Sequence, residues 1–226
     1  QASAAAEPLA IGIVAVVSGE GLRNVFESLG ANAIVSGGQT MNPSTQDLLE
    51  AVNAVPSDKV IILPNNSNIL LAAQQAQALA DKQVVIVPSK TAPQGIAALL
   101  AFNYQGDLDS NAEAMIASSQ QVQTIEVTRA VRAAQVNGLT IEDGQFIGLL
   151  NDDLQTVAND AASVVWQLLE RIGADDYEIV TIYYGQDVLP EEAEEMASSI
   201  RVAYPHLEIE VLSGGQPHYH YVISAE

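Results

Sequence analysis

Short apolar runs separated by helix-like segments fill the first hundred residues, and they constrain the fold more than any other feature. The runs at 11–17 (IGIVAVV), 60–64 (VIILP) and 84–88 (VVIVP) are almost continuously apolar, and 33–36 (AIVS) is a shorter one. Such runs are typical of strands that are covered on both faces. The segments between them carry apolar residues at helical spacing, as in GLRNVFESLG at 21–30. This alternation predicts a parallel sheet with helices on both sides.

The second half of the chain has a different pattern. YQGDLDSN at 104–111 has the composition of a linker, and a helical stretch follows it. TIEVTRAVRAAQ at 124–135 then alternates like a strand, with Asn137-Gly138 as a tight hairpin turn. Further strands and helices are mixed up to the end of the chain. We therefore expect an α/β, two-lobed fold, with a parallel-sheet lobe over residues 1–106 and a mixed α+β lobe over residues 107–226.

The composition excludes several classes of function. The absence of Cys removes disulfides, thiolate nucleophiles and cysteine-based zinc sites. The formal net charge is −20, from 28 acidic and 8 basic residues, so the surface repels nucleic acid and anionic lipid. No apolar run is long enough to cross a bilayer. The densest acidic cluster, EEAEE at 191–195, is explained by a solvated helix face or, alternatively, by a docking surface for a basic partner.

The stretch LSGGQ at 212–216 matches the signature loop of ABC-type ATPases, and SGGQ recurs at 36–39. ATP binding of that kind also needs a Walker A loop, in which a lysine follows a glycine. The lysines of this chain are Lys59, Lys82 and Lys90, and none of them follows a glycine. The signature loop also needs a helix behind it to direct its amide groups at phosphate, whereas an alternating strand pattern follows here. The match is therefore interpreted as coincidental, and no kinase motif such as HRD or DFG is present.

Segments spread along the chain, in order, resemble one protein family. They are IVSGGQTMNPSTQDLLEAV at 34–52, VIILPNNSNILLAAQQA at 60–76, VVIVPSKTAPQGIAALLAF at 84–102 and SGGQPHYHYVISAE at 213–226. Together they resemble the C-terminal region of the bacterial fatty acid kinase A protein, which is dihydroxyacetone-kinase-like and of the DhaL/YloV type. The resemblance extends over residues 11–226. It implies a DegV-like fold, a cytoplasmic bacterial protein and a part in lipid and phospholipid metabolism.

The resemblance also implies that this region carries no cofactor of its own. In the family, ATP and magnesium are bound by a DhaL-like domain that lies N-terminal to it, followed by a middle domain. The start of the chain, QASAAAEPLA, has neither Met nor the features of a signal peptide, and it is interpreted as the cut edge of a longer polypeptide. In the family, dimerisation involves the middle region, so we expect a monomer in isolation.

The loops that match those of DegV proteins contain the candidate ligand-binding or partner-binding residues. In DegV proteins, the loop corresponding to TMNPS at 40–44 holds a lipid carboxylate, and the other loops follow later strands or precede the last one. We expect the loops to converge at a cleft between the lobes, because ligands of open α/β sheets bind at the carboxyl ends of the strands. The alternative is that these polar residues form turns and helix caps. The candidates are Gly37, Gly38, Thr40, Asn42, Ser44, Asn65, Asn66, Ser67, Ser89, Gln94, His218 and His220.

The pair His218 and His220 is spaced so that both side chains would lie on one face of a strand. A zinc site needs a third ligand, and neither a Cys nor a convincing third His accompanies the pair. We therefore expect no metal, and a place at the rim of the cleft or on a docking face.

Three functions follow from these observations. The first is a non-catalytic module of a two-component fatty acid kinase, which docks an acyl-carrying DegV-type partner so that the distant ATP domain can transfer phosphate. The second is a binding module that holds a fatty acid or small anion between the lobes. The third, a free-standing hydrolase, ranks last because the chain has no GxSxG elbow.

The isolated chain is expected neither to bind nor to hydrolyse ATP, because it lacks a Walker A loop and has a strand after LSGGQ. Isothermal titration calorimetry with Mg-ATP tests this directly. Saturable binding with micromolar affinity would contradict it.

Overall fold

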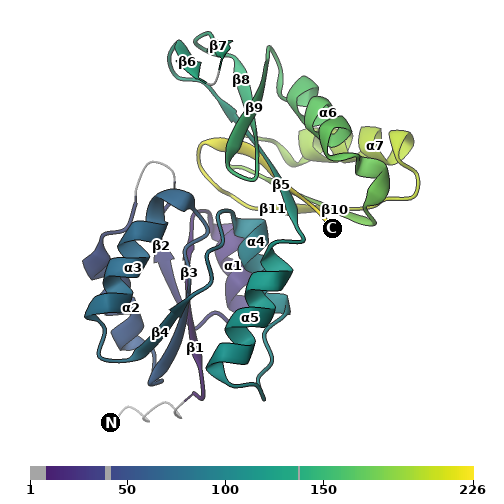
Figure 1. Cartoon of the computed structure of the whole chain (residues 1–226). Coiled ribbons are helices and arrows are strands. Elements are labelled where there is room, and N and C mark those ends of the chain that lie inside the picture. Colours follow the sequence, from purple (N-terminus) through teal and green to yellow (C-terminus); the bar gives the residue numbers. More distant parts are fainter. Residues whose placement is uncertain (1–8, 39–41, 137) are drawn as a thin grey trace, which may run out of the picture. The chain divides into compact units, whose positions relative to one another are not determined.

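The computed structural model describes residues 9–38, 42–136 and 138–226 (Figure 1). The chain divides into two compact units. Unit 1 consists of the residues up to 17 together with 23–120, and unit 2 consists of 18–22 together with 121–226. Each unit has its own sheet and its own hydrophobic core.

Unit 1 is built around a parallel four-stranded sheet with the strand order β2-β1-β3-β4. The sequence-based expectation of a parallel sheet between helices is confirmed. Its elements are β1 (Gly12–Val17), α1 (Glu20–Ser28), β2 (Ala33–Ser36), α2 (Thr45–Ala54), β3 (Lys59–Leu63), the 3-10 turn η1 (Ser67–Ile69), α3 (Leu70–Leu79), β4 (Gln83–Ile86), α4 (Ala92–Leu100) and α5 (Leu108–Ser119).

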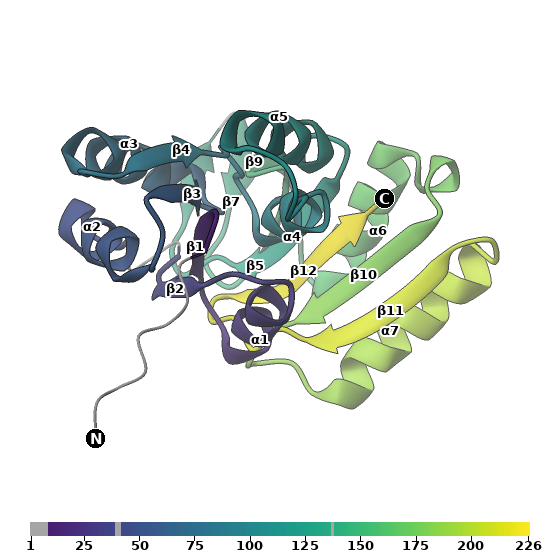
Figure 2. The same cartoon turned by 90° about the horizontal axis from the view of Figure 1, so that it is seen from below.

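Helices cover both faces of this sheet. Helices α2 and α3 lie on one side, and α1, α4 and α5 lie on the other (Figures 1 and 2). Successive residues of a strand point to opposite faces, so Val14 and Val16 of β1 pack with Leu48 and Val52 of α2, while Ile13 of the same strand points the other way. Both sets are buried. This double covering is the reason that β1 and β3 are apolar at nearly every position.

Helix α2 begins at a capping box. The Ser44 hydroxyl accepts from the backbone N–H of Asp47 at 3.1 Å, and the Asp47 carboxylate accepts from the N–H of Ser44 at 2.7 Å. The sequence predicted a cap at Ser44 or Thr45, and the structure places it at Ser44. The hydrogen bonds from the Ser44 side chain and backbone lower the pKa of Asp47, because they stabilise its charged form.

Helix α5 belongs to unit 1, although the sequence assigned it to the second lobe. It packs against α4, where the Ser118 hydroxyl donates to the carbonyl of Ala97 at 2.9 Å. The linker-like residues before it form a hydrogen-bonded turn into the helix, with the Asn111 amide donating to the carbonyl of Asn103 at 2.9 Å. Unit 1 therefore extends to residue 120, beyond the boundary near Gly106 expected from composition.

Unit 2 contains a mixed six-stranded sheet with the order β11-β10-β12-β5-β8-β9, in which only β10 and β11 are parallel neighbours. Beside it stands a separate two-stranded hairpin, β6-β7. The elements are β5 (Gln123–Arg129), β6 (Ala134–Val136), β7 (Leu139–Ile141), β8 (Phe146–Leu150), β9 (Asp153–Ala158), α6 (Ala161–Ile172), the 3-10 turn η2 (Ala174–Asp176), β10 (Ile179–Tyr184), α7 (Pro190–Ala203), β11 (Glu208–Ser213) and β12 (Tyr219–Ala225).

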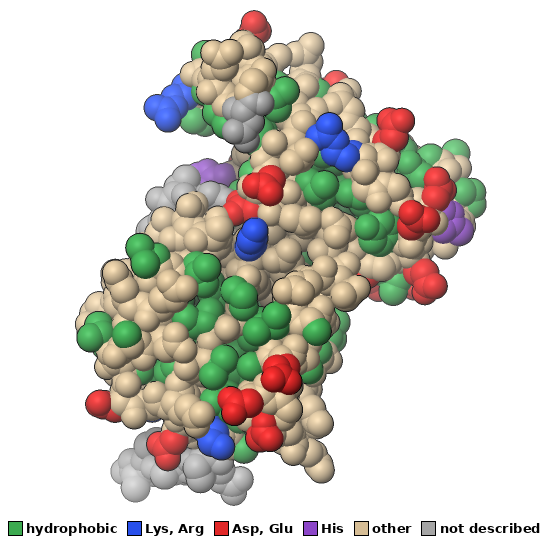
Figure 3. Space-filling view, in the orientation of Figure 1, with side chains coloured by type: hydrophobic (Ala, Val, Ile, Leu, Met, Phe, Trp, Pro, Cys, Tyr) green, Lys and Arg blue, Asp and Glu red, His purple; other side chains and the backbone are tan. Residues whose placement is uncertain are grey.

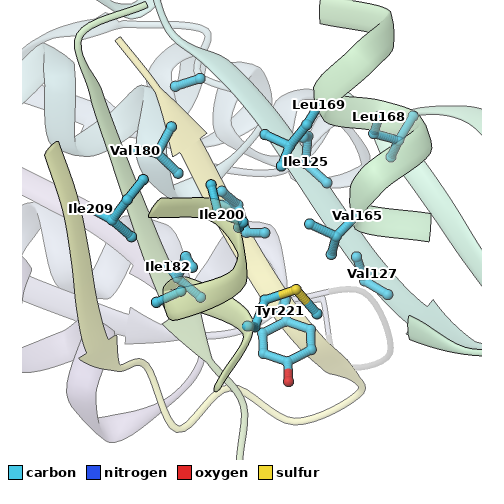
Figure 4. Packing of buried hydrophobic residues seen from close by; sticks show 14 of the residues in the cluster. Ile125, Val127, Val165, Leu168, Leu169, Val180, Ile182, Ile200, Ile209 and Tyr221 are labelled. Carbon is cyan, nitrogen blue, oxygen red and sulfur yellow. The ribbon is translucent and has the colours of Figure 1, made fainter. Parts of the chain in front are cut away.

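The core of unit 2 lies between this sheet and helices α6 and α7. Figure 4 shows Val165 and Leu169 of α6 close to Ile125 and Val127 of β5. Ile200 of α7 belongs to the same cluster and is fully buried. Among the residues that the structure describes, no helix is both long and apolar enough to span a membrane.

The single strand expected at 124–135 is two strands, and this expectation was wrong. Strand β5 pairs with β8 up to Arg129, and the N–H of Ala130 then donates to the carbonyl of Gln145 and closes that ladder. The chain next enters the β6-β7 hairpin, where Val136 pairs with Leu139. Gly138 has a φ of +80°, which suits the tight turn expected there, and Asn137 lies outside the described residues.

One carboxyl group is buried in unit 2. Glu126 of β5 lies between Ile125 and Val127, so it points to the face of the sheet opposite the core shared with α6 and α7. It is 6% exposed, and among the described residues its Oε2 atom has no hydrogen-bond partner. Burial raises the pKa of Glu126 from 4.5 to about 8, and the nearby charge of Asp152 adds to the rise.

Replacing Glu126 by Gln is expected to remove a pH dependence of stability. Between pH 4.5 and 8 the folded protein keeps a proton that the unfolded chain releases, so the free energy of unfolding of the wild type falls as the pH rises. At pH 7 the loss amounts to roughly 3 kcal/mol. Urea unfolding from pH 5 to pH 8 measures it, with the exposed Glu170→Gln as the control. Parallel pH curves for the wild type and Glu126→Gln would contradict the expectation.

Candidate functional site at the carboxyl edge of the parallel sheet

The strand order of unit 1 places a topological switch point at the carboxyl ends of β1 and β3. The chain passes from β1 to β2 on one side, and β3 lies on the other side of β1. Such a switch point is where ligands of open α/β sheets usually bind. Three of the candidate loops begin at this edge, after β2, β3 and β4.

The Asn65 side chain joins the loops at this edge. Its amide nitrogen donates to the carbonyl of Val16 at the end of β1 at 3.0 Å, and its Oδ1 accepts from the Ser89 hydroxyl at 2.7 Å. The Ser89 hydroxyl also accepts from the backbone N–H of Asn65 at 3.1 Å. Ser89 is 2% exposed and Asn65 is half-buried, so the network is largely shielded from solvent. The hydrogen-bonding groups of both side chains are therefore largely engaged inside the protein.

Gly95 makes room for this network. It lies in the first turn of α4, and a Cβ atom there would come within 2.1 Å of Asn65 Oδ1. Asn65 has a φ of +54°, in the left-handed region that asparagine tolerates better than most residues. Sequence reasoning missed Gly95 as an individual residue. The available signal was a glycine near the start of a helix, where a residue with higher helix propensity is normally found.

Several other candidates lie in helix caps and turns, which is the alternative role considered for these polar residues in the sequence analysis. The Asn66 side chain accepts from the N–H of Asn68 at 2.8 Å and begins η1, and Ser44 begins α2. The Gln94 side chain accepts from the N–H of Lys90 at 2.8 Å, in the turn that precedes α4. These bonds satisfy backbone N–H groups that have no partner within a helix. A binding role for Ser44, Asn66 and Gln94 stays a prediction.

The remaining described candidates of unit 1 are Gly37, Gly38, Asn42 and Ser67. The N–H of Gly37 donates to the carbonyl of Val17 at 3.3 Å, and Gly38 follows it in the chain. Asn42 and Ser67 are exposed. Thr40 lies outside the described residues.

His218 and His220 do not share a strand face, and that expectation was wrong. His218 precedes β12 with a φ of +70°, and the register of β12 against β5 shifts between Tyr219 and Tyr221. The His220 ring lies 5.0 Å from the Phe146 ring, centroid to centroid, in an edge-on contact. Burial lowers the pKa of His220. In the part of the chain that the structure describes, no three His, Asp or Glu side chains are grouped to hold a metal ion.

The LSGGQ segment packs closely against Gly21 and Leu22 within unit 2. The Gly214 carbonyl accepts from the N–H of Leu22 at 3.0 Å, and a Cβ atom on Gly21 would lie 1.7 Å from the Ser213 carbonyl oxygen. Gln216 is 3% exposed, and its amide donates to the Tyr183 carbonyl at 2.9 Å. Strand β12 follows, as the alternating pattern predicted. Glycines on both segments therefore permit a close backbone contact.

The fold is that of the DegV proteins. A DegV family protein from Corynebacterium glutamicum superposes with a TM-score of 0.68 over 96% of this chain and 96% of that one, at 15% sequence identity. The fatty acid kinase B3 protein of Streptococcus pneumoniae, solved with linoleic acid, superposes with a TM-score of 0.63 at 12% identity, over 96% of this chain and 99% of that one.

Sequence similarity shows the family of the chain. Residues 12–226 match the FakA-like C-terminal family, which is the C-terminal region of fatty acid kinase A and similar proteins, and the chain belongs to that family. Protein YloV of Bacillus subtilis is 45% identical over 215 residues, which are 95% of this chain and 39% of YloV. The chain therefore spans about two fifths of the length of that relative. The resemblance found in the sequence is confirmed.

A double-mutant cycle on Asn65 and Gly95 tests how this edge is built. Gly95→Ala alone is expected to destabilise the protein by roughly 1–3 kcal/mol, because the new methyl group overlaps Asn65. Asn65→Gly alone keeps the left-handed backbone but loses the amide network, at a cost of about 1–3 kcal/mol. In the double variant the overlap is gone, so Gly95→Ala should add little further cost. Additive losses in urea unfolding would show that the two residues do not interact in this way.

Proposed function

We propose that this chain is the C-terminal, DegV-like module of a two-component fatty acid kinase and that it docks an acyl-carrying DegV-type protein. The observation that carries the proposal is its membership of the FakA-like C-terminal family over residues 12–226. In this proposal the module is non-catalytic by itself. ATP and magnesium are bound by another part of a longer protein, since relatives such as YloV are much longer than this chain.

The closed network at the carboxyl edge supports docking over lipid binding. A site for a fatty acid needs polar groups that are free to bind its carboxylate. Here the Asn65 amide bonds Val16, and the Ser89 hydroxyl bonds Asn65. A carboxylate that bound through Asn65 or Ser89 would have to displace bonds that these side chains already make.

A second candidate is a module that holds a fatty acid or a small anion between its two lobes. It is favoured by the DegV-like fold, since the kinase B3 protein of S. pneumoniae with that fold was solved with linoleic acid. Native mass spectrometry of the recombinant chain distinguishes the candidates. A co-purified acyl chain supports the binding module, and its absence together with a complex formed on adding a DegV-type carrier supports docking.

Helix α7 provides the acidic face for the docking proposal. Figure 3 shows acidic side chains scattered over the visible surface, with few Lys or Arg side chains among them. On α7, Glu192 accepts from the N–H of Leu189 at 3.2 Å, and Glu194 pairs with Arg201 at 2.6 Å. Both have structural partners, whereas Glu191 and Glu195 are exposed and appear in neither contact. These two are therefore the cleaner positions for a test of charge.

The double variant Glu191→Lys/Glu195→Lys is expected to slow association with a DegV-type carrier by about tenfold or more at low salt. The reason is electrostatic steering, which salt weakens because the Debye length is only ~8 Å at physiological ionic strength. The control is Asp109→Lys/Glu113→Lys, which makes the same charge change on exposed positions of α5. Stopped-flow association rates at two salt concentrations measure the effect.

Equal slowing by the α5 control would assign the effect to net charge and would remove α7 from the docking surface. An association rate that neither pair changes would leave α7 as solvated surface.

A further inference from the structure

Unit 1 presents a preformed aromatic patch at the amino-terminal end of its sheet, opposite the carboxyl edge. The patch consists of Leu9, Phe102 and Tyr104, and Figure 2 views unit 1 from this end. Tyr104 is 75% exposed and Leu9 is 38% exposed. Leu100, close by in the chain, is 63% exposed. Large exposed side chains of this kind are common anchors of protein interfaces when they are held rigidly.

The loop that carries Tyr104 is fixed by a buried side chain. Asn111 of α5 is 2% exposed, and its Oδ1 accepts from the N–H of Asn103 at 2.7 Å. Its amide donates to the carbonyls of Asn103 and Asp107 at 2.9 and 3.0 Å. The Asn103 side chain in turn accepts from the N–H of Gln105 at 3.0 Å. These bonds hold the backbone on both sides of Tyr104.

The Tyr104 ring is held as well. It stands edge-on to the Phe102 ring at 5.0 Å between centroids, with an interplanar angle of 90°. Its hydroxyl oxygen would lie 2.5 Å from a Cβ atom on Gly30, so the ring lies close over the residues that follow α1. An exposed aromatic side chain that is already ordered loses little conformational entropy on binding.

Hollows lie on either side of Leu9 at this end. A small one of about 80 Å³ is lined mainly by apolar residues, including Ile11, Ile13 and the two rings. A larger, shallow one of about 480 Å³ is bounded by Val55, Pro56 and Lys82. The patch therefore combines protruding apolar side chains with recesses, and a surface of this shape can pack closely against a partner.

The path of the chain at Leu9 and the length of a relative indicate which partner binds at the amino-terminal end of the sheet. The N–H of Leu9 donates to the carbonyl of Pro56 at 2.9 Å, so the chain enters the fold across this end. The family match is to a C-terminal region, and the relative YloV extends well beyond the part that this chain covers. A region that precedes residue 1 in a protein of that length is joined to Leu9 through eight residues, so its effective concentration at the patch reaches the millimolar range.

We propose that the aromatic patch is an intramolecular docking surface for the region that precedes this module in the longer protein. The contact holds the module by its amino-terminal end through Tyr104 and Leu9. The proposal rests on the family assignment and is independent of the docking of a carrier, because that binding can be measured with the 226-residue chain alone.

Hydrogen exchange with mass spectrometry tests the contact. The full-length product of the natural reading frame is compared with the 226-residue chain, with Tyr104→Ser as the variant and Val131→Ser, 89% exposed in unit 2, as the matched control. In the full-length protein the peptides covering Leu9 and residues 100–107 are expected to exchange about tenfold more slowly. Tyr104→Ser should abolish that difference, and Val131→Ser should leave it unchanged.

Equal exchange of these peptides in the long and short proteins would overturn the proposal. Protection that appears in the 226-residue chain as its concentration is raised would assign the patch to a second copy and would also overturn it. The melting temperature of Tyr104→Ser in the 226-residue chain shows whether the substitution disturbs the fold. If it does, Leu9→Ser replaces it, with the same expected loss of protection.

Discussion

The amide of Asn65 is the interaction on which the carboxyl edge of the parallel sheet depends. It links the end of β1, through the carbonyl of Val16, to the loop after β4, through the hydroxyl of Ser89. The arrangement requires a left-handed backbone at Asn65 and a glycine at position 95. Because Ser89 is buried and Asn65 is half-buried, removing one side chain leaves its partner short of a hydrogen bond, and such a loss costs more than the bond itself contributes.

This closed edge bears on how a common fold can serve different functions. The DegV fold places loops at the carboxyl ends of parallel strands, and that position suits a ligand. Whether one binds is decided by the side chains there, since a fold by itself does not define a function. In this chain the polar side chains of Asn65 and Ser89 are hydrogen-bonded to each other. These hydrogen bonds join the loops after β3 and β4 and hold them in one arrangement.

The parallel sheet of unit 1 could be predicted because its determinants are local. Strands buried on both faces read as continuous apolar runs, and helix starts such as Ser44 carry their own capping residues. The break after β5 could not be predicted in the same way. It depends on where the ladder with β8 ends, at Arg129 and Phe146, and those partners are remote in sequence.

The candidate site, too, could be predicted only in part from local sequence. Asn, Ser and Gly in loops after strands were found easily, but their roles were not, because a cap and a ligand contact use the same residue types. Asn65 and Asn66 are neighbours of the same type, and the positive φ of Asn65 and its packing against Gly95 give its side chain a different direction. The expectation that His218 and His220 share a strand face was wrong for a related reason. A register shift within β12 cannot be predicted from the alternation of residues alone.

The two ends of unit 1 are separated by the strands themselves. In a parallel sheet every strand starts at one end and finishes at the other, and strands of four to six residues are about 13–20 Å long. A contact at Tyr104 therefore leaves the carboxyl edge around Asn65 uncovered by the same contact. In the proposed arrangement the module is held at one end of its parallel sheet, and the loops at the other end take no part in that contact.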